Sequence, residues 1–533
     1  MTTLSARRTS PSPPLFAALE RPECFPHPVS GIRVVETHIS WVLLTGTYAY
    51  KIKKPVDLGF ADFTTLELRR HYCQEELRLN RRFAPGLYLD VVPICGSAGS
   101  PRIGGDGPVL EYAVKMREFP QDALASRSLA AGKFGASDID ALATWTAEFH
   151  ASTPAAPTGS MLGSPDAVQA STMQNFEQML PLVKTQSDDS ALRALQLWTA
   201  HEFTARRKAL EARKASGCVR ECHGDLHLGN IALLDGKPVP FDCIEFNDEL
   251  RWIDVMNEAA FLVMDLEDRG RGDLGWRFLN RYLEAAGDYA GIEVLRFYLV
   301  YRALVRAKVH LLRSRQPRLR RDEKLHLAQA FHEYLLLARR FSAPRRAAVI
   351  LAHGLSGCGK TTVTQSLIEQ LGAIRVRSDL ERKRLHNMAP LAASGSALGA
   401  GIYSAGSTTA TYRRLGVLAQ IILGAGFPVV IDATFLLRAE REVFRAIAEK
   451  FEVPFRILDF RAPLELLRAR VEQRLARAND ASEADLDVLE RQIAMRESLT
   501  PAEMEVAIAV DGARPLDPAM WQPFIERLHA AAT

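Results

Sequence analysis

Two short segments hold most of the side chains that could do chemistry. In the first, HGDLHLGN at residues 223–230, four residues separate Asp225 from Asn230, and Asp242 follows seventeen residues past Asp225. Phosphoryl transfer needs a carboxylate that orients the acceptor hydroxyl, and oxygen ligands for a metal ion that neutralises phosphate charge. We therefore expect Asp225 to be the catalytic base, and Asn230 and Asp242 to bind Mg²⁺.

The residues between them indicate how the metal ligands meet. IALLDGKPVPFD, residues 231–242, is typical of two short apolar strands joined at Asp235-Gly236, a pair that favours a tight hairpin turn. Such a hairpin brings Asn230 and Asp242 close together. A capped turn between core strands would explain one of the polar residues but not the spacing of all three.

The second segment, HGLSGCGKTT at residues 353–362, lies between the apolar run AAVILA and the helical pattern TTVTQSLIEQLG. Its glycines let successive backbone N–H groups surround a phosphate, and the N-terminus of the following helix adds partial positive charge. We expect Lys360 to reach the β- and γ-phosphates and the Thr361 hydroxyl to bind Mg²⁺. The expected nucleotide-binding residues here are Gly354, Leu355, Ser356, Gly357, Cys358, Gly359, Lys360, Thr361 and Thr362.

Further polar residues of the second half suggest which reaction this loop serves. Asp379 ends the strand-like IRVRSD and is expected to be a second catalytic base, with Arg382 placed to hold an anionic acceptor. Asp432 ends VVID and is expected to support the Mg²⁺ shell. The stretch 467–486, an arginine-bearing helical face with an adjoining flexible segment, predicts a lid that brings guanidinium groups onto phosphate, although a solvated helix face would also explain any one of the arginines. The predicted lid arginines are Arg470, Arg474 and Arg477.

The surrounding elements divide the chain into two domains that meet near residue 342. Short strands rich in β-branched and aromatic residues are expected at 32–36, 41–44, 48–53 and 108–119. A helix is expected at 65–83, a Gly/Pro-rich loop at 96–108, and mostly helix from 138 to 335 around the segment 218–250. After residue 342, short apolar strands alternate with helices, which predicts a parallel, doubly wound sheet. The expected domain ranges are a flexible leader at 1–24, a first domain at 25–340 with a lobe boundary near 120, and a second domain at 341–533.

The first domain must also supply a nucleotide-binding lobe. Ala49-Tyr50-Lys51 resembles the Ala-x-Lys of a kinase strand, so Lys51 is expected to contact the α- and β-phosphates, with Lys53 as an open alternative. The helix that follows offers Glu75 or Glu76 as the carboxylate that orients the lysine. The spacing alone does not choose between them, and a surface ion pair would also explain either.

These residues resemble the aminoglycoside-phosphotransferase-like branch of the protein-kinase fold, over about residues 25–335. That branch has H-G-D-x-x-x-x-N where protein kinases have H-R-D, and this chain has Gly224; AEFHAS, which contains His150, and the segment 246–254 are also similar. The resemblance implies that MREF, residues 116–119, is the adenine-binding hinge. A G-x-G-x-x-G loop is missing, so the turn at 37–40 must contact phosphate, with the Ser40 hydroxyl and backbone N–H groups.

The second half looks like the small P-loop kinases of the polynucleotide-kinase, zeta-toxin and gluconate-kinase kind, over about residues 345–530. Both halves together resemble bacterial proteins described as bifunctional aminoglycoside phosphotransferase and ATP-binding (AAA family ATPase-type) proteins. The resemblance implies ATP and Mg²⁺ as cofactors. It does not fix the acceptor substrate.

Composition excludes several other classes of protein. The net charge of +4 is too small to predict a nucleic-acid or membrane partner, and no run of about 18 apolar residues that would span a bilayer is present. Seven scattered cysteines without a CxxC pair indicate reduced thiols and make zinc unexpected. The N-terminus lacks the apolar core of a secretion signal. We therefore expect a cytoplasmic protein.

The leading hypothesis is an ATP- and Mg²⁺-dependent phosphotransferase with two nucleotide sites and small-molecule hydroxyl acceptors. One alternative is a single active kinase fused to a regulatory P-loop ATPase, and another is a nucleotide-binding regulator without chemistry, against which the two candidate bases argue. An RNA 5′-hydroxyl acceptor for the second half would fit the basic run at 301–321. There, however, Arg and Lys alternate with apolar residues at helical spacing, which favours a packed helix. The sequence does not predict an oligomeric state.

Overall fold

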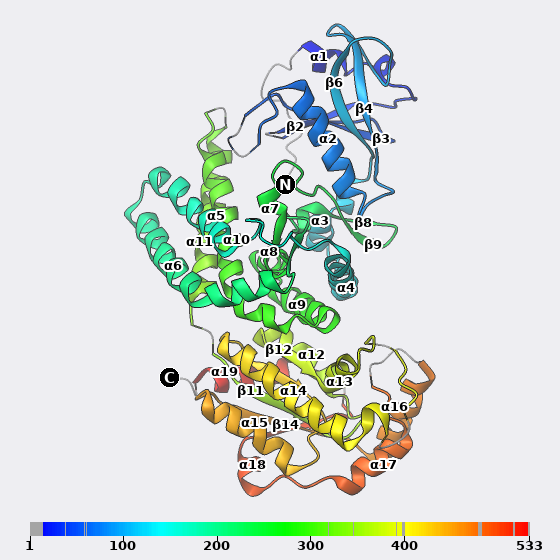
Figure 1. Ribbon diagram of the computed structural model, residues 1–533, viewed down its shortest axis with the longest axis vertical. Helices are drawn as coiled ribbons and strands as arrows, with labels where there is room; N and C mark the ends of the chain where they lie inside the picture. Colours follow the sequence, from blue (N-terminus) through cyan, green and yellow to red (C-terminus); the bar gives the residue numbers. More distant parts are fainter. Residues whose placement is uncertain are drawn as a thin grey trace.

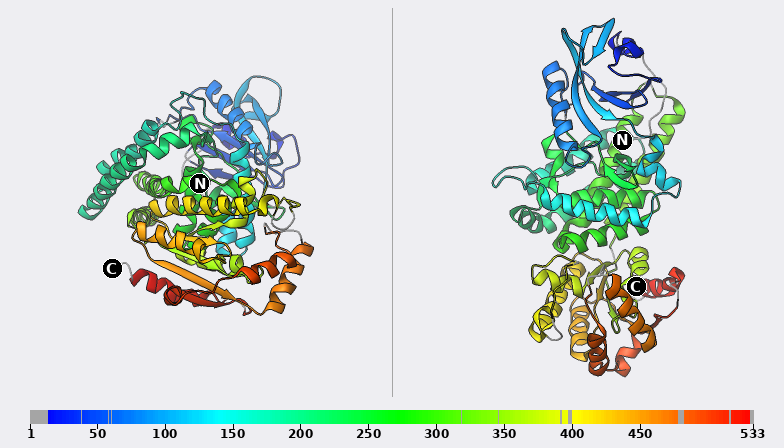
Figure 2. Two further views of the ribbon diagram at one scale, coloured as in Figure 1. Left: turned by 60° about the horizontal axis from the view of Figure 1, so that its bottom comes forward. Right: turned by 90° about the vertical axis from the view of Figure 1, so that its right-hand side faces the viewer.

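The computed structural model describes residues 14–37, 39–57, 59, 61–317, 319–344, 346–390, 392–396, 400–477, 482–514 and 517–530, without the side chains of 475–477, 529 and 530. An antiparallel sheet, a helical region and a second sheet domain follow one another along the longest axis (Figure 1). The side view shows the same order, with the C-terminal domain below the helical region (Figure 2). None of the helices in these ranges combines the length and hydropathy of a membrane-spanning segment.

The first lobe is a six-stranded antiparallel sheet in the order β1-β2-β3-β6-β4-β5. Helix α2 packs on β6 and β4 and begins after Thr65, whose hydroxyl accepts from the Leu68 N–H. The expected strands lie within two residues of β1, β2, β3 and β6. The bounds are β1 Arg33–Glu36, β2 Ser40–Leu44, β3 Tyr48–Lys53, α2 Leu66–Asn80, β4 Tyr88–Ser97, β5 Ser100–Ile103 and β6 Val109–Arg117.

Two expectations for this lobe are wrong. The Gly/Pro-rich segment 96–108, expected to be a loop, contains β5, because Gly96 at φ +106° lets β4 turn tightly into it. The expected flexible leader is packed where the structure describes it. Its elements α1 (Pro14–Ala18) and η1 (Pro22–Cys24) bury Phe16 and Leu19 against the sheet, and the Phe16 ring centroid lies 3.8 Å from that of Trp41.

The second lobe is mainly helical, as expected, and its core is formed by α8, α9 and α10. The basic run forms part of α10, which packs along α11 and buries Leu304 and Leu311, so the packed-helix interpretation is confirmed for the residues of α10. The helices are α3 Ala125–Ala130, α4 Ala136–Ser152, α5 Pro165–Met179, α6 Gln186–Ala215, α7 Asp248–Arg251, α8 Val255–Asp268, α9 Gly272–Ala286, α10 Ile292–Ser314 and α11 Arg321–Ser342, with η2 Gln121–Ala123, η3 Leu180–Leu182, η4 Leu228–Asn230 and η5 Tyr289–Gly291. The short strands are β7 Val219–Glu221, β8 Ile231–Leu234, β9 Lys237–Pro240 and β10 Trp252–Asp254.

The C-terminal domain is a five-stranded parallel sheet in the order β12-β13-β11-β14-β15, with helices on both faces, as predicted. Alternate residues of β11 face different cores: Val349 and Leu351 pack with α14 and α15, whereas Ile350 packs with α12 and α19. The strands are β11 Val349–His353, β12 Ile374–Arg377, β13 Val429–Asp432, β14 Phe455–Arg461 and β15 Ala507–Asp511. The helices are α12 Lys360–Leu371, α13 Ser378–Leu385, α14 Ala405–Gly424, α15 Arg438–Lys450, α16 Leu464–Arg477, α17 Leu486–Met495, α18 Pro501–Glu505 and α19 Gln522–Ala530, with η6 Gly401–Tyr403 and η7 Pro518–Trp521.

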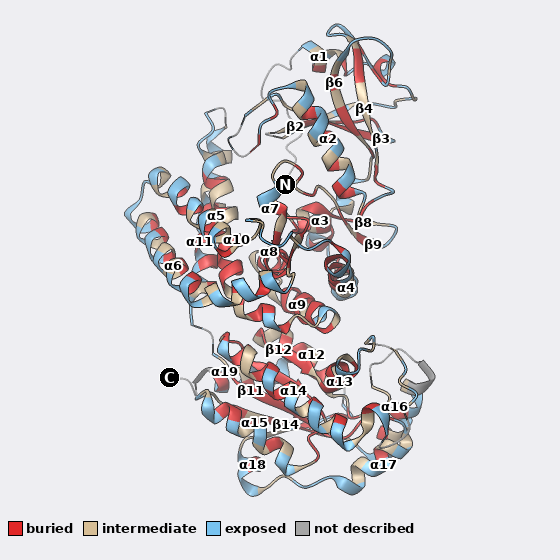
Figure 3. Ribbon diagram, in the orientation of Figure 1, coloured by how far each residue is buried: buried red, intermediate tan, exposed pale blue. Residues whose placement is uncertain are grey.

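Helix α9 of the first domain covers the exposed edge of this second sheet. β12 is an edge strand, and the Asn280 side chain on α9 bonds to it twice, donating to the Ala373 carbonyl (2.9 Å) and accepting from the Arg375 N–H (2.7 Å). The Tyr289 hydroxyl donates to the Arg375 carbonyl (3.3 Å). One hydrophobic core runs through both domains at this junction, and Figure 3 shows buried residues there on both sides. The two halves are therefore joined by a buried interface.

We predict that Asn280→Ala lowers the free energy of unfolding. It leaves the buried Ala373 carbonyl and Arg375 N–H without partners, which should cost about 2 kcal/mol or more. Gln329→Ala, which removes an exposed amide from α11, is the control and should change stability by no more than about 0.5 kcal/mol. Urea unfolding of the full chain measures both, and equal effects would contradict the role given to Asn280.

Candidate active sites

The first site is a cavity of about 160 Å³ between the N-terminal sheet and the helical lobe. Five apolar side chains from β1, β2, β3 and β6 line it on the side of the sheet, and all four residues of the expected hinge, 116–119, also line it. An apolar slot beside a backbone segment suits a flat heterocycle such as adenine. The remaining lining residues are Val35, Thr37, Val42, Leu44, Ala49, Lys51, Leu87, Tyr88, Gln121, Leu124, Ser126, Arg127, Gly229, Phe241 and Asp242.

A buried charge network distinguishes the two candidate lysines. Lys51 lines the cavity, and its Nζ lies 2.5 Å from Asp242 Oδ1 and 2.8 Å from Glu76 Oε1. Lys53 does not line the cavity and instead donates to Glu76 (2.8 Å) and Glu245. Burial alone lowers the pKa of Lys51, but Asp242 and Glu76 raise it well above its ordinary value, so the amine is protonated. Of the two candidate lysines, Lys51 is the one that lines the cavity.

The structure distinguishes Glu75 from Glu76, between which the sequence does not choose. Glu75 pairs with Arg78 on its own helix, whereas Glu76 is fully buried and bonds both lysines. Adjacent positions on a helix point in directions about 100° apart, so only the packing of α2 could decide between them. The expected phosphate turn also differs in detail: Thr37 lines the cavity and Ser40 does not. The Ser40 hydroxyl is buried on the same face of β2 as Val42, and none of the described residues is its hydrogen-bond partner. His38 of this turn lies outside the described residues.

The catalytic-loop segment has the predicted hairpin. β8 and β9 are antiparallel, and the Phe241 N–H donates to the Asn230 carbonyl (2.9 Å), so the two ends of the hairpin meet. The Asn230 amide donates to Asp225 Oδ2 (2.8 Å), and Asn230 Oδ1 is buried without a hydrogen-bond partner among the described residues. Asp242 has φ +65°, and its N–H donates to the Tyr88 hydroxyl (3.0 Å). The Asn230 carboxamide oxygen and the Asp242 carboxylate thus stand at the two ends of the hairpin, which meet. Both are oxygen ligands of the kind that Mg²⁺ requires.

Asp225 is ionised, and a neutral histidine lies beside it. The Gly229 N–H donates to His227 Nδ1 (3.0 Å), so the ring proton is on Nε2, which lies 3.4 Å from Asp225 Oδ2. Burial lowers the pKa of His227 to about 4. Burial alone raises the pKa of Asp225, but His227 and Arg306 favour the charged form and leave this pKa well below its ordinary value. The Asp225 side chain is 31% exposed, which leaves it accessible to a substrate.

The loop that carries Asp225 is attached to the helical core from behind. Gly224 has φ +86°, and a Cβ there would lie 2.7 Å from the Leu250 carbonyl oxygen, which requires glycine. Its N–H donates to Glu258 Oε1 (2.7 Å), and the other oxygen of Glu258 bonds His150 Nε2 (2.8 Å). His150 Nδ1 in turn bonds the Tyr282 hydroxyl on α9 (3.0 Å). His150 therefore orients the residue that anchors the loop.

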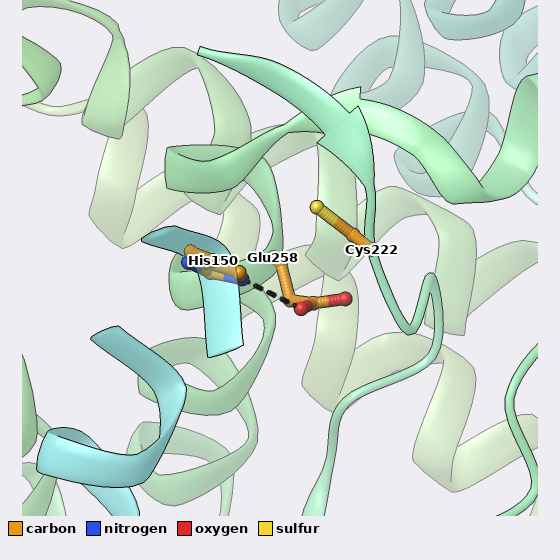
Figure 4. Close-up of side chains that lie close together, drawn as sticks. All are labelled: His150, Cys222 and Glu258. Atoms are coloured by element: carbon orange, nitrogen blue, oxygen red, sulfur yellow. Dashed lines mark hydrogen bonds and ion pairs between the residues drawn. The ribbon is translucent and has the colours of Figure 1, made fainter. Parts of the chain in front are cut away.

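His150, Glu258 and Cys222 lie close enough together to suggest a metal site (Figure 4). Both nitrogens of His150 and both oxygens of Glu258 already have hydrogen-bond partners, and the Cys222 thiol donates to the Ile253 carbonyl (3.6 Å). Burial raises the pKa of Cys222 well above its ordinary value, which disfavours the thiolate that a metal ion needs. We interpret the cluster as the anchor of the catalytic loop. All seven cysteines are free.

The second site is a cleft of about 1320 Å³ above the carboxyl ends of the parallel strands. The phosphate-binding loop leads from β11 into α12, and Gly359 at φ +89° starts the helix. Lys360 Nζ donates to the carbonyls of Gly354 (2.8 Å) and Leu355 (3.0 Å) inside the loop. Of the nine residues predicted here, Gly354, Leu355 and Cys358 do not line the cleft. Those that do are Ser356, Gly357, Gly359, Lys360, Thr361 and Thr362.

The predicted metal and base residues line the same cleft. The Thr361 hydroxyl donates to Asp432 Oδ2 (2.6 Å), a pair of oxygens that fits Mg²⁺. Asp379 lies in the first turn of α13, opposite the loop. Arg382 on the same helix is buried, and its Nε has no hydrogen-bond partner within the described part of the chain. Arg377, which the sequence analysis did not single out, also lines the cleft.

The predicted lid contributes two described arginines to the cleft, and the Arg477 side chain lies outside the described residues. Arg470 donates to the Gly512 carbonyl (2.8 Å) and Arg474 to the Ala484 carbonyl (2.8 Å), so neither is a freely solvated surface arginine. Gln492 on α17 accepts from the Ser356 N–H (2.9 Å) and donates to the Ser356 hydroxyl (3.0 Å). The sequence analysis does not identify this residue, because no local motif marks it. Arg413, Arg491 and Arg514 add further positive charge to the lining.

Known proteins resemble both parts of the chain. Residues 349–499 match a family described as an AAA domain. Over 507 residues the chain is 31% identical to the uncharacterized protein Rv2004c of Mycobacterium tuberculosis, an alignment that covers 94% of this chain and 97% of the relative. The uncharacterized protein Mb2027c of Mycobacterium bovis matches to the same extent. The chain belongs to the family of these mycobacterial proteins.

Solved structures are similar to each half separately. An amicoumacin kinase, hAmiN, covers 60% of this chain and 91% of its own, with 15% identity and a TM-score of 0.36. A gluconokinase from Sinorhizobium meliloti covers 36% of this chain and 99% of its own, with 20% identity and a TM-score of 0.26. The expected architecture, an antiparallel-sheet lobe and a helical lobe followed by a parallel, doubly wound sheet with a phosphate-binding loop, is confirmed.

We predict a pH-dependent stabilisation from Glu76. Burial alone raises the pKa of Glu76, but Lys51 and Lys53 lower it to about 2, below the ordinary value of 4.5. Because the folded-state pKa is lower than the unfolded one, the stabilisation is complete above pH 4.5 and is lost as the pH falls toward 2. The stability difference between wild type and Glu76→Gln should therefore shrink as the pH falls from about 5 to about 3.

Urea unfolding at a series of pH values measures this difference. Glu67→Gln is the control, because Glu67 is an exposed carboxylate in the first turn of the same helix with no lysine beside it among the described residues. The stability of this variant should follow that of wild type closely. A Glu76→Gln deficit that stays constant over the pH range would show that Glu76 contributes packing rather than charge.

Proposed function

We propose that this protein is an ATP- and Mg²⁺-dependent phosphotransferase with two nucleotide sites, each of which transfers the γ-phosphoryl group to a hydroxyl of a small molecule. The observation that carries the proposal is that each half combines a concave site, a lysine that lines it, two side chains that offer oxygen atoms to a metal ion, and a separate carboxylate. A nucleotide-binding regulator needs the first three features but not the last.

In the first site, Lys51 contacts the α- and β-phosphates and stays protonated because Asp242 and Glu76 flank it. Asn230 and Asp242 hold Mg²⁺, which supplies positive charge to the phosphates when it is bound. Asp225 accepts the acceptor hydroxyl's proton. Its role differs from that of Asp242 because it does not line the nucleotide cavity, and its carboxylate instead bonds the Asn230 amide.

In the second site, backbone N–H groups of the loop and Lys360 bind the phosphates, and Thr361 with Asp432 holds Mg²⁺. Asp379 takes the proton of the acceptor. The described part of the lining carries eight Lys or Arg side chains and three Asp or Glu side chains, so it favours an acceptor with negative charge. Arg382 binds that charge, because the buried guanidinium has an unpartnered N–H and no carboxylate pairs with it among the described residues.

This distribution makes carboxylated or phosphorylated hydroxyl compounds the first class to screen as acceptors, and transfer only to their neutral counterparts would contradict it. A nucleic-acid acceptor has no further support, because the basic run at 301–314 is a packed helix.

The seven free cysteines favour a reducing compartment, which in a bacterium is the cytoplasm.

The first test counts the nucleotide sites. Calorimetric titration of the full chain with a non-hydrolysable ATP analogue and Mg²⁺ should give two sites per chain, and Lys360→Ala should leave one, because the P-loop lysine is then missing. Lys450→Ala removes an exposed lysine of the same domain and should leave both sites. One site in the wild-type protein would favour a single kinase.

The second test separates the two acidic residues of the first site. Asp225→Asn keeps an oxygen that accepts from the Asn230 amide, so Mg²⁺-ATP binding should be nearly unchanged while turnover falls by roughly 10²- to 10⁴-fold, the usual contribution of a positioned base. Asp242→Asn should weaken Mg²⁺-dependent ATP binding as well as turnover. Calorimetry beside turnover or basal ATP hydrolysis measures both variants. Equal losses of ATP affinity would mean that the loop acts as one structural unit without a separate base.

A further inference from the structure

A carboxylate from the first domain lies behind the phosphate-binding loop of the second. Glu284 is on α9, and its side chain is only 3% exposed. Its Oε1 accepts from Arg375 Nε (3.0 Å) and Nη2 (2.8 Å), and its Oε2 lies 3.6 Å from Arg377 Nη1. Both arginines belong to β12, the edge strand that α9 covers. One acidic group of the first domain therefore contacts two guanidinium groups of the second.

Arg375 connects this carboxylate to the phosphate-binding loop. Its Nη1 donates to the Thr361 carbonyl oxygen (2.9 Å), while Nε and Nη2 are held by Glu284. The planar guanidinium thus bridges the two domains with a fixed geometry. Thr361 is the residue whose hydroxyl donates to Asp432, so Arg375 fixes the backbone of one proposed Mg²⁺ ligand.

Arg377 extends the same connection to the second ligand. Its Nε lies 4.0 Å from Asp432 Oδ2, the oxygen that accepts from the Thr361 hydroxyl (2.6 Å). The two arginine side chains that Glu284 contacts therefore reach the two residues that supply the proposed oxygen ligands, Thr361 through its backbone carbonyl and Asp432 through its carboxylate. Burial alone raises the pKa of Glu284, but Arg375 and Arg377 bring this pKa below its ordinary value. The carboxylate that contacts the two arginines is therefore charged.

We propose that Glu284 is a positioning residue of the C-terminal nucleotide site: through Arg375 and Arg377 it holds Thr361 and Asp432 in their metal-binding arrangement, so that the P-loop site is complete only when the first domain is docked on β12. This inference rests on the proposed function of the C-terminal site. Glu284 touches neither nucleotide nor acceptor, and partners of metal ligands typically contribute through orientation.

The test uses the full chain and measures metal dependence instead of turnover. The Mg²⁺ concentration needed for half-maximal binding of the ATP analogue is determined by calorimetry, and the signal lost in Lys360→Ala identifies the C-terminal site. Glu284→Gln should raise that concentration at the C-terminal site by roughly 10- to 100-fold and leave the N-terminal site unchanged. Metal-free analogue binding at the C-terminal site should change little, because the loop N–H groups remain.

Glu369→Gln is the matched control. Glu369 on α12 forms another ion pair across the same interface, with Arg277 Nη1 at 3.0 Å, and no described contact joins it to Thr361 or Asp432. The control should lose interface stability without a change in Mg²⁺ dependence. The proposal would be overturned if Glu284→Gln lost thermal stability but required the same Mg²⁺ concentration for analogue binding as Glu369→Gln.

Arg375→Lys tests the same connection independently, and its Mg²⁺ dependence can be measured even where Glu284→Gln does not fold. A lysine keeps the positive charge but cannot contact Glu284 and the Thr361 carbonyl together as the guanidinium does, so the same weakening of Mg²⁺ dependence is expected. The double variant should be no worse than either single one, because both act through one connection. If no binding signal of wild type disappears in Lys360→Ala, the proposed function of the C-terminal site fails before the role of Glu284 is tested.

Discussion

The burial of α9 between the two domains constrains both of them. On one side, Tyr282 bonds His150, which orients the glutamate that anchors the catalytic loop. On the other side, Asn280 and Glu284 hold the backbone and side chains of an edge strand. These residues lie within two turns of one helix, so a displacement of α9 along its axis would disturb the loops of both candidate active sites.

The charged and polar groups at both sites are held in place by contacts within the protein. Lys51 is held between two carboxylates, and the Thr361 hydroxyl is already bonded to Asp432. Preorganised charges stabilise developing charge in a reaction because they need little reorganisation. The same arrangement also satisfies buried ions that would otherwise cost stability, since an unpaired buried charge is strongly destabilising. Residues such as Glu76 and Glu284 therefore serve folding and site geometry together.

Local spacing in the sequence predicted much of this arrangement. Asp225, Asn230 and Asp242 lie on one hairpin, and Lys360 and Thr361 lie in one loop, so a few residues of chain determine their relative positions. Prediction failed where packing between distant segments decides. Glu75 and Glu76 are equivalent in local pattern, and only the docking of α2 on the sheet buries Glu76. Gln492 reaches the phosphate-binding loop across 136 residues of sequence. No motif in the neighbouring sequence marks Glu76 or Gln492 for the contact that it makes.

The edge of a β-sheet also explains why the two domains are packed against each other. An uncovered edge strand presents unpaired N–H and carbonyl groups that promote association with other chains. Here side chains of the first domain bond to these groups on β12, in place of a further strand. A flexible linker would leave that edge open, whereas a docked helix closes it and fixes the orientation of the sheet. The strand that needs this cover is also the one whose arginines reach the phosphate-binding loop. Covering the edge and ordering the site are therefore consequences of the same contact.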